Sequence, residues 1–234
     1  MQDFDVLFND KTPRNEINAK VYRIVESDLE VATLSITNSL AEQSRLEELL
    51  EEIKPLSHAS KKHFLLTTPF RYPPLKYGSR YGTANMKSFF YGSKEPMTCL
   101  YECAYYRFLF LNDIAIPFDE PIQTNHLLFS CAVSSQHSLE LTHDKYLHIR
   151  EIITHSTDYT TTQKIGKWAV ENNFEVIKFP SARYKTGINY AIASVNNIKS
   201  RVPKNAERLP CTSTPDRVIF KYNSNWVSIR SQEF

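Results

Sequence analysis

Residues 61–94 read KKHFLLTTPFRYPPLKYGSRYGTANMKSFFYGSK, and they decide how the rest of the chain is interpreted. The stretch holds seven Lys or Arg residues and no acid. Shortly after it comes Glu102, which follows Tyr91 by eleven residues, as Tyr91 follows Arg80. Guanidinium groups bind phosphate oxygens, aromatic rings cover flat ligands, and a carboxylate stabilises positive charge that develops on a sugar. The pattern therefore predicts a site for an anionic ligand with a ribosyl carbon to be attacked.

Hydrophobic patterning around this stretch indicates strands mixed with helices. A helix is expected from Ser93, as its N-cap, through Phe110, with Glu102 on the flank of its apolar face. A second helix is expected over 160–172, and strands over 64–70, 88–91, 126–133, 174–179, 188–195 and 216–222. The regular strand-helix alternation of a doubly wound sheet is absent, as is a glycine-rich phosphate loop. The predicted class is therefore α+β.

The first 60 residues differ from the remainder in charge and in pattern. They hold twelve acids against six bases, so the chain's net charge of +2 divides into −6 for residues 1–60 and +8 for residues 61–234. Thr12-Pro13 is followed by Ile17, Val21 and Ile24 at helical spacing, and a second apolar stripe predicts a helix over about 40–53. We therefore expect residues 1–60 to form a helical extension packed on a core domain of residues 61–234.

Composition excludes several classes of protein. Hydrophobic residues make up 41% and charged residues 23%, which excludes collagen-like and largely disordered chains. Neither a bilayer-spanning apolar run nor a secretory leader is present, so a cytoplasmic protein is expected. The four cysteines lack CxxC spacing and the seven histidines are scattered, so no metal site is expected.

Several ordered motifs resemble those of the RES-domain family. They are FRYPP (70–74), GSRYG (78–82), FYG (90–92), ECAYYR (102–107), DYTTTQKIG (158–166) and PSAR (180–183), followed by Asn189. Members of that family are bacterial proteins, many of them toxins of toxin-antitoxin pairs whose antitoxin has an Xre-like DNA-binding domain. The resemblance extends over most of the chain, and it depends on the order and spacing of the motifs together.

The resemblance implies an ADP-ribosyltransferase-like mixed sheet with flanking helices. It also implies cleavage of NAD at the nicotinamide N-glycosidic bond, with phosphate, water or a protein side chain as the acceptor. NAD is then the substrate, and no cofactor is expected. The implied catalytic residues are Glu102, Arg71 and Thr160, and the implied NAD-binding residues are Arg71, Tyr72, Arg80, Tyr91, Gln163 and Asn189. The family's serine falls on Thr160 by context, and Ser181 is a second candidate.

Other interpretations of the same residues stay open. Glu102 alone would suit a solvated helix position, Tyr91 a core aromatic, and Thr160 a helix cap. The expected partner is an Xre-like antitoxin, with no membrane and with nucleic acid only through that antitoxin. One alternative function is single-stranded nucleic-acid binding, because aromatic and basic residues alternate through 61–94 as in a stacking platform. Another is an inactive scaffold, suggested by threonine in place of the family's serine.

Overall fold

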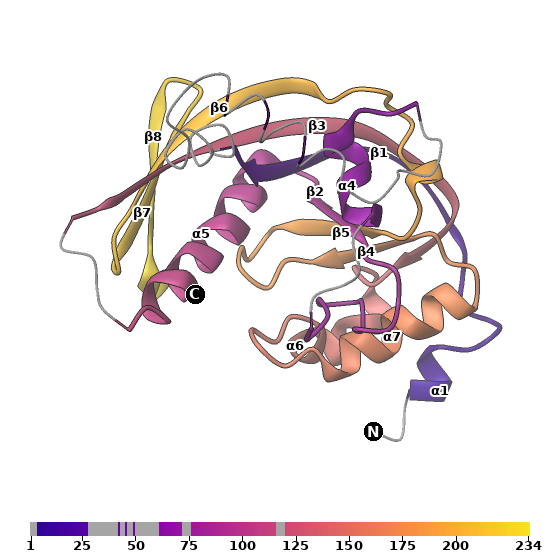
Figure 1. Cartoon of the computed structure of the whole chain (residues 1–234). Coiled ribbons are helices and arrows are strands. Elements are labelled where there is room, and N and C mark those ends of the chain that lie inside the picture. The colour runs from indigo at the N-terminus through magenta and orange to yellow at the C-terminus, as the bar shows by residue number, and fades with distance from the viewer. Residues whose placement is uncertain are drawn as a thin grey trace.

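The computed structural model describes residues 4–27, 42, 45, 49, 61–71, 76–115 and 120–234. Within these residues the chain forms an eight-stranded mixed sheet flanked by helices, in the strand order β1-β2-β5-β4-β3-β6-β7-β8 (Figure 1). The prediction of an α+β mixed sheet with flanking helices is confirmed. No helix in the described ranges is both long enough and apolar enough to cross a membrane.

The bounds of the elements follow in chain order. The strands are β1 Asn15–Glu26, β2 Phe90–Ser93, β3 Ile122–Glu140, β4 Val176–Pro180, β5 Ile188–Ile192, β6 Lys204–Ser213, β7 Arg217–Tyr222 and β8 Asn225–Arg230. The α-helices are α1 Phe4–Leu7, α4 Phe64–Arg71, α5 Pro96–Asn112, α6 Arg150–Ile153 and α7 Thr160–Glu171. Short 3-10 helices span Asp144–Ile149, Val195–Asn197 and Ser231–Glu233.

Five of the strands close into a ring. β1 pairs with both β2 and β3, and the circuit continues through β5 and β4, with β3 and β4 parallel and the other pairs antiparallel. One residue from each strand of the ring reaches a single apolar cluster with no exposed surface: Val21, Phe90, Phe129, Val176 and Ile192. Because strand residues alternate in direction, this cluster fixes which side chains of β1, β2 and β5 point the other way.

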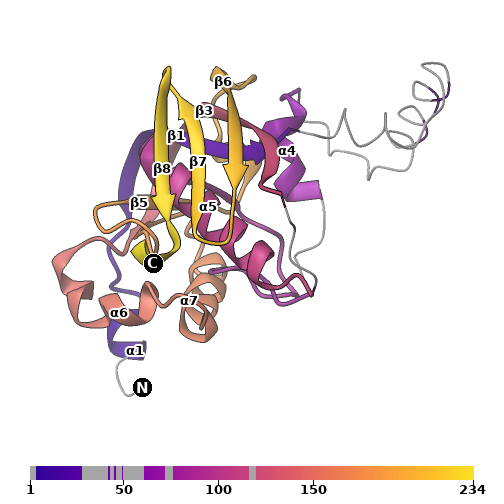
Figure 2. The ribbon, with the colours of Figure 1, turned by 90° about the vertical axis from the view of Figure 1, so that its left-hand side faces the viewer.

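Helices α5 and α7 cover different parts of the sheet. The apolar face of α5 packs on the extension β6–β8, which lies in front of α5 in Figure 2. That face is formed by Cys99, Leu100, Ala104 and Phe108. Helix α7 joins a separate cluster with Tyr81 and with Phe179 of β4. Two of the predicted site residues, Tyr91 of β2 and Asn189 of β5, lie on the sheet.

The predicted N-terminal helix beginning at Thr12-Pro13 is wrong. Residues 15–26 are the strand β1, which pairs with β3 from Asn15 to Glu26. A spacing of four residues, as between Ile17 and Val21, returns to the same face of a strand as well as of a helix, and β-branched side chains favour the strand. The first part of the expected extension thus belongs to the sheet. The predicted helix over 40–53 lies outside the described residues, except that Glu42, Arg45 and Leu49 are helical.

The remaining element predictions had mixed outcomes. The expected strand over 64–70 is wrong, because these residues form α4, whose Leu66 and Phe70 lie on one helical face and pack against the ring. Ser93 does not cap α5, since the N-cap residue is Glu95, without a side-chain hydrogen bond, and Pro96 follows it. The helices expected at 93–110 and 160–172 are confirmed, as are the strands at 88–91, 126–133, 174–179, 188–195 and 216–222, apart from small shifts at their ends.

Candidate active site

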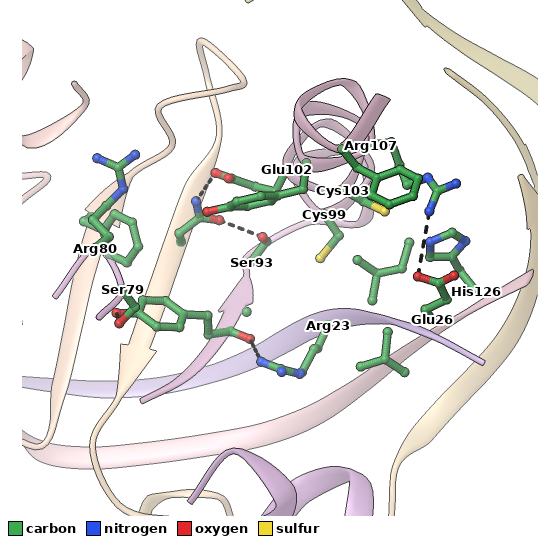
Figure 3. Close-up of a pocket in the computed structure, with 18 residues that line it drawn as sticks. Arg23, Glu26, Ser79, Arg80, Ser93, Cys99, Glu102, Cys103, Arg107 and His126 are labelled. Carbon is green, nitrogen blue, oxygen red and sulfur yellow. Dashed lines mark hydrogen bonds and ion pairs between the residues drawn. The ribbon is translucent and has the colours of Figure 1, made fainter. Parts of the chain in front are cut away.

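A cavity of about 590 Å³ lies between α5 and strands β1, β2 and β5 (Figure 3). Four of the residues predicted from the sequence line it: Arg80, Tyr91, Glu102 and Asn189. They come from the loop before β2, from β2, from α5 and from β5, so residues up to 109 positions apart in sequence meet in one place. A volume of this size is typical of pockets that bind small molecules and cofactors.

The Glu102 carboxylate is held by two short hydrogen bonds. Its Oε1 accepts from Ser181 Oγ and from Asn189 Nδ2, both at 2.6 Å. Asn189 Oδ1 in turn accepts from Ser93 Oγ at 2.6 Å. Both bonds to the carboxylate go to Oε1, which leaves Oε2 without a hydrogen bond to the residues that the structure describes. The glutamate is therefore fixed in orientation with one oxygen available to a ligand.

The backbone orients Ser181. Its hydroxyl oxygen accepts from the N–H groups of Arg183 and Tyr184, each at 3.1 Å, so its proton is directed at Glu102. Ser181 follows the end of β4, and its own N–H donates to the carbonyl of Gly187 at 2.8 Å, which closes the turn between β4 and β5. Of the two hydroxyl candidates from the sequence, Ser181 is therefore the one that contacts Glu102.

Thr160 lies elsewhere. It is the exposed first residue of α7 and is absent from the lining of the cavity. Its backbone N–H donates to the carboxylate of Asp158 at 2.8 Å, so the aspartate satisfies one of the free N–H groups at this end of α7, whose N-cap residue is Tyr159. A hydrogen bond from the Thr160 hydroxyl, and after it the bond from the Thr160 N–H, lowers the pKa of Asp158. The location of Thr160 suits a helix terminus and gives it no contact with Glu102.

Tyr91 fixes the loop of residues 76–89 that closes one end of the cavity. Its hydroxyl shares a hydrogen bond of 2.9 Å with Ser79 Oγ and accepts from the Tyr81 N–H at 3.0 Å. Burial raises the pKa of Tyr91 to about 12, so the phenol is neutral at physiological pH. Tyr91 thus lines the cavity while its hydroxyl holds the loop.

Arg80, which belongs to this loop, and Gln163 of α7 tie the loop to neighbouring segments. Arg80 Nη1 donates to the carbonyls of Ile153 at 3.0 Å and His155 at 2.9 Å, and its guanidinium lies 4.5 Å from the centroid of the Tyr159 ring. Gln163 Nε2 donates to the carbonyls of Tyr77 and Ser79, both at 3.1 Å. Gly166 of α7 permits this approach, because a Cβ at that position would clash with the carbonyl oxygen of Tyr81. Gln163 is not a lining residue, and Arg80 has already committed one nitrogen.

Arg71 and Tyr72 are not brought to this cavity by the described structure. Arg71 is the last residue of α4, is partly buried, and is absent from the lining. Tyr72 lies outside the described residues. The expected convergence of Arg71, Arg80 and Glu102 is therefore observed only for Arg80 and Glu102.

Other lining residues were missed by the sequence interpretation. Arg23 and Glu26 come from β1, which was assigned to a helical extension, Arg107 ends the ECAYYR motif but was given no role, and His126 belongs to no motif. A signal was available for Arg107, because it lies five residues after Glu102 on the same predicted helix. Nothing in the local sequence would have paired it with β1. Ser93 was recognised, but as a helix cap rather than as a partner of Asn189.

Two of the aromatic residues expected to form a stacking platform for nucleic-acid bases are buried instead. Tyr81 and Phe90 have no exposed surface, and the Tyr81 ring packs edge-on against Phe179 at 4.7 Å between centroids. Buried rings cannot stack on bases. No group of three or more His, Cys, Asp and Glu side chains that could hold a metal ion occurs within the described ranges.

Comparison with known proteins agrees with the motifs. No curated protein matches the chain. Among solved structures, the crystal structure of the M. tuberculosis MbcT-MbcA toxin-antitoxin complex is similar with a TM-score of 0.49 and 12% identity, over 88% of this chain and 90% of that chain. The sequence model of the RES domain matches residues 55–212, which is more than half of the chain. This protein therefore belongs to the RES domain family.

Proposed function

We propose that this protein cleaves the nicotinamide N-glycosidic bond of NAD. The observation that carries the proposal is the Glu102 carboxylate, held by Ser181 and Asn189 at 2.6 Å inside a cavity large enough for a nucleotide. Membership of the RES domain family, together with the motifs that resemble its NAD-cleaving members, supports NAD as the substrate.

Glu102 acts through its charge. As the bond between the ribose C1′ and the nicotinamide nitrogen breaks, its electron pair leaves with nicotinamide and the ribose becomes oxocarbenium-like. A carboxylate beside that carbon stabilises the transition state more than the neutral ribose of the ground state. The two hydrogen bonds to Oε1 fix the carboxylate in advance, so little reorganisation accompanies the reaction.

The neighbouring residues orient Glu102 and line the cavity that the substrate would occupy. Asn189 and Ser181 both hold Glu102, and Ser93 fixes the amide of Asn189 in the orientation that donates to the carboxylate. Tyr91 lines the cavity, so its ring can contact a bound ribose or nicotinamide. The acceptor of the ADP-ribosyl group is phosphate, water or a protein side chain.

The direct test is NAD consumption by the purified protein, with and without inorganic phosphate, with products identified by mass. Free ADP-ribose indicates hydrolysis, an ADP-ribose phosphate indicates phosphorolysis, and a mass increase on protein indicates transfer. Glu102→Gln is the matched control, since its amide oxygen retains an acceptor for Ser181 and Asn189 but carries no charge. Absence of nicotinamide release both with and without phosphate would contradict the proposal.

In the cell, we propose that this activity makes the protein the toxin of a toxin-antitoxin pair whose partner is an Xre-like antitoxin. Support comes from its family, many members of which have that role. Expression in a bacterial host should arrest growth and deplete NAD, and Glu102→Gln should abolish both effects. Normal growth with an undiminished NAD pool on expression of the wild-type protein would exclude the toxin role.

A further inference from the structure

Arg183 joins the turn that carries Ser181 to helix α5. Its guanidinium carbon lies 3.3 Å from the centroid of the Tyr105 ring. Tyr105 follows Glu102 by three residues on α5, so the two side chains share one side of the helix. Arg183 follows Ser181 by two residues, so its contact with α5 runs beside the Ser181–Glu102 hydrogen bond. The turn and the helix are thus joined at two adjacent points, and one of them is the bond that orients the glutamate.

The Arg183 side chain is buried, and it also bonds a third segment. Its residue exposure is 5%. Nη2 donates to the carbonyl of Ser156 and, at 3.4 Å, to the hydroxyl of Tyr159. A planar guanidinium can cover an aromatic ring with its face while it donates hydrogen bonds in its own plane. Arg183 is therefore fixed between the Tyr105 ring on α5 and the segment of residues 153–159.

The segment of residues 153–159 is held from another direction by Arg80. Arg80 donates to two of its backbone carbonyls, and the Arg80 guanidinium lies 4.5 Å from the centroid of the Tyr159 ring. Tyr159 therefore contacts both arginines, with its ring at Arg80 and its hydroxyl at Arg183. The segment that anchors Arg183 is thus itself tied to the loop of residues 76–89.

Arg183 can influence Glu102 through Ser181. Its side chain does not line the cavity, so it offers no contact to a ligand there. Its backbone N–H donates to Ser181 Oγ at 3.1 Å, and this bond helps to direct the proton of the hydroxyl at Glu102. A shift of Arg183 away from α5 would therefore move the donor that orients Ser181.

We infer that Arg183 is a positioning residue, which holds the turn against α5 so that the Ser181 hydroxyl stays directed at Glu102. This inference rests on the proposed function, because it concerns the carboxylate to which that function assigns the chemistry. A residue that acts only by orienting a catalytic group changes kcat and leaves substrate binding unaltered. The loss of Arg183 should therefore have that kinetic signature.

The first test is kinetic. Arg183→Met removes the guanidinium but keeps a long side chain, so kcat for nicotinamide release should fall roughly tenfold, with KM for NAD changing less than about twofold. Arg14→Met is the matched control. Arg14 also lies over a ring, 4.8 Å from the centroid of Phe174, and donates to the carbonyl of Asn172 at 2.9 Å, but it has no contact with the turn or the cavity. It should keep wild-type kcat, and wild-type kcat in Arg183→Met would contradict the inference.

The Ser181→Ala background separates positioning from a general loosening of the fold. If Arg183 acts through the Ser181 hydroxyl, adding Arg183→Met to Ser181→Ala should lower kcat by less than about a further twofold. General loosening would instead multiply the two losses, because each would act independently. Multiplied losses in the double variant would overturn the inference.

Amide hydrogen exchange, followed by NMR spectroscopy, tests the geometry without turnover. The N–H of Tyr184 donates to Ser181 Oγ, and the N–H of Gly187 donates to the Tyr184 carbonyl. Both should exchange at least about tenfold faster in Arg183→Met, whereas amides of α7 should keep their rates. Unchanged exchange at the turn would exclude the role of Arg183. Faster exchange in a protein whose wild type releases no nicotinamide would instead refute the proposed function and support the holding of the turn by Arg183.

A conservative variant covers the case in which Arg183→Met does not fold, as a thermal unfolding scan would show. Arg183→Lys keeps a cation for the Tyr105 ring but cannot also donate in the plane to Ser156, so kcat should fall about three- to fivefold with KM unchanged. The turn amides should again exchange faster. Wild-type kcat and wild-type exchange in Arg183→Lys would then count against the inference.

Discussion

The two ends of the cavity differ in how completely their charged groups are bonded, although Glu102 and Arg107 stand on the same helix five residues apart. Glu102 is held by hydrogen bonds of 2.6 Å from Ser181 and Asn189. Arg107 has contacts of 3.3 Å and 3.8 Å and one buried nitrogen without a partner in the described structure. Glu102 is oriented by the protein itself, whereas Arg107 keeps hydrogen-bonding capacity that the described residues do not satisfy.

This difference separates chemistry from binding. A preorganised carboxylate contributes mainly to the transition state, so its loss should lower kcat. Under-bonded cations contribute to the bound substrate and the transition state alike, so their loss should raise KM. Variants at the two ends should therefore show different kinetic signatures in the same assay.

The largest effect is expected for Glu102→Gln. The variant keeps an oxygen for the bonds from Ser181 and Asn189 but loses the charge, so kcat for nicotinamide release should fall roughly 10²–10³-fold or more. Thermal unfolding should change little. Glu171→Gln, at an exposed ion pair with Lys167 on α7, is the control and should keep full activity. Wild-type kcat in Glu102→Gln would break the comparison, because the preorganised end would then have no part in catalysis.

Ser181→Ala and Thr160→Ala together test which hydroxyl group supports Glu102. Ser181 donates to Glu102, so its loss should lower kcat about ten- to a hundredfold with little change in KM. Thr160 is exposed at the start of α7 and has no contact with Glu102, so its loss should affect kcat far less. Steady-state kinetics of the two variants, purified and assayed in parallel, shows which hydroxyl supports catalysis. The reverse order of effects would return the family's serine role to Thr160.

Arg80→Ala tests whether Arg80 serves mainly to hold the loop of residues 76–89 or binds the substrate. Two hydrogen bonds join its guanidinium to the carbonyls of Ile153 and His155, so its loss should lower the free energy of unfolding by about 1–3 kcal/mol. Urea denaturation measures this. KM for NAD should then rise only as far as the loop is loosened. A tenfold rise in KM at unchanged stability would mean that Arg80 binds the substrate directly rather than holding the loop.

The sequence predicted the surroundings of Glu102 better than those of Arg107 for a physical reason. Glu102, Tyr91 and Asn189 have roles implied by the resemblance, and the helix and strands that hold them have clear patterns. The contact of Arg107 with Glu26 needs β1 to pair with β3 across about 100 residues, and β1 was taken for a helix because Ile17 and Val21 satisfy both periodicities. Long-range pairing is not visible in a local window.

The sequence assigned the wrong roles to hydroxyl groups for a related reason. Thr160 and Ser181 both follow a plausible context in sequence, and only the turn between β4 and β5 brings one of them to α5. Likewise, Ser93 precedes a helix and reads as its cap, yet the antiparallel pair of Ser93 with Asn189 draws its hydroxyl to the amide instead. For Ser93, the tertiary hydrogen bond outweighed local capping.

The smallest effect is expected for Tyr91→Phe, which should change the unfolding free energy mainly at alkaline pH. Burial raises the pKa of Tyr91 to about 12 in the folded protein, compared with about 10 in an unfolded chain. Between these pH values the folded state retains a proton that the unfolded state has lost, so stability falls as pH rises from 10 towards 12.

Removing the phenol removes that dependence, so the unfolding free energy of Tyr91→Phe should fall less steeply with pH, by at most about 1.4 kcal/mol per pH unit. At pH 7 the variant should lose about 1 kcal/mol, because the hydroxyl no longer bonds Ser79 and the Tyr81 N–H. Urea denaturation from pH 7 to 11 measures both effects. Equal slopes for the two proteins would show that the Tyr91 hydroxyl is not enclosed, and that it does not fix the loop of residues 76–89 in the way described.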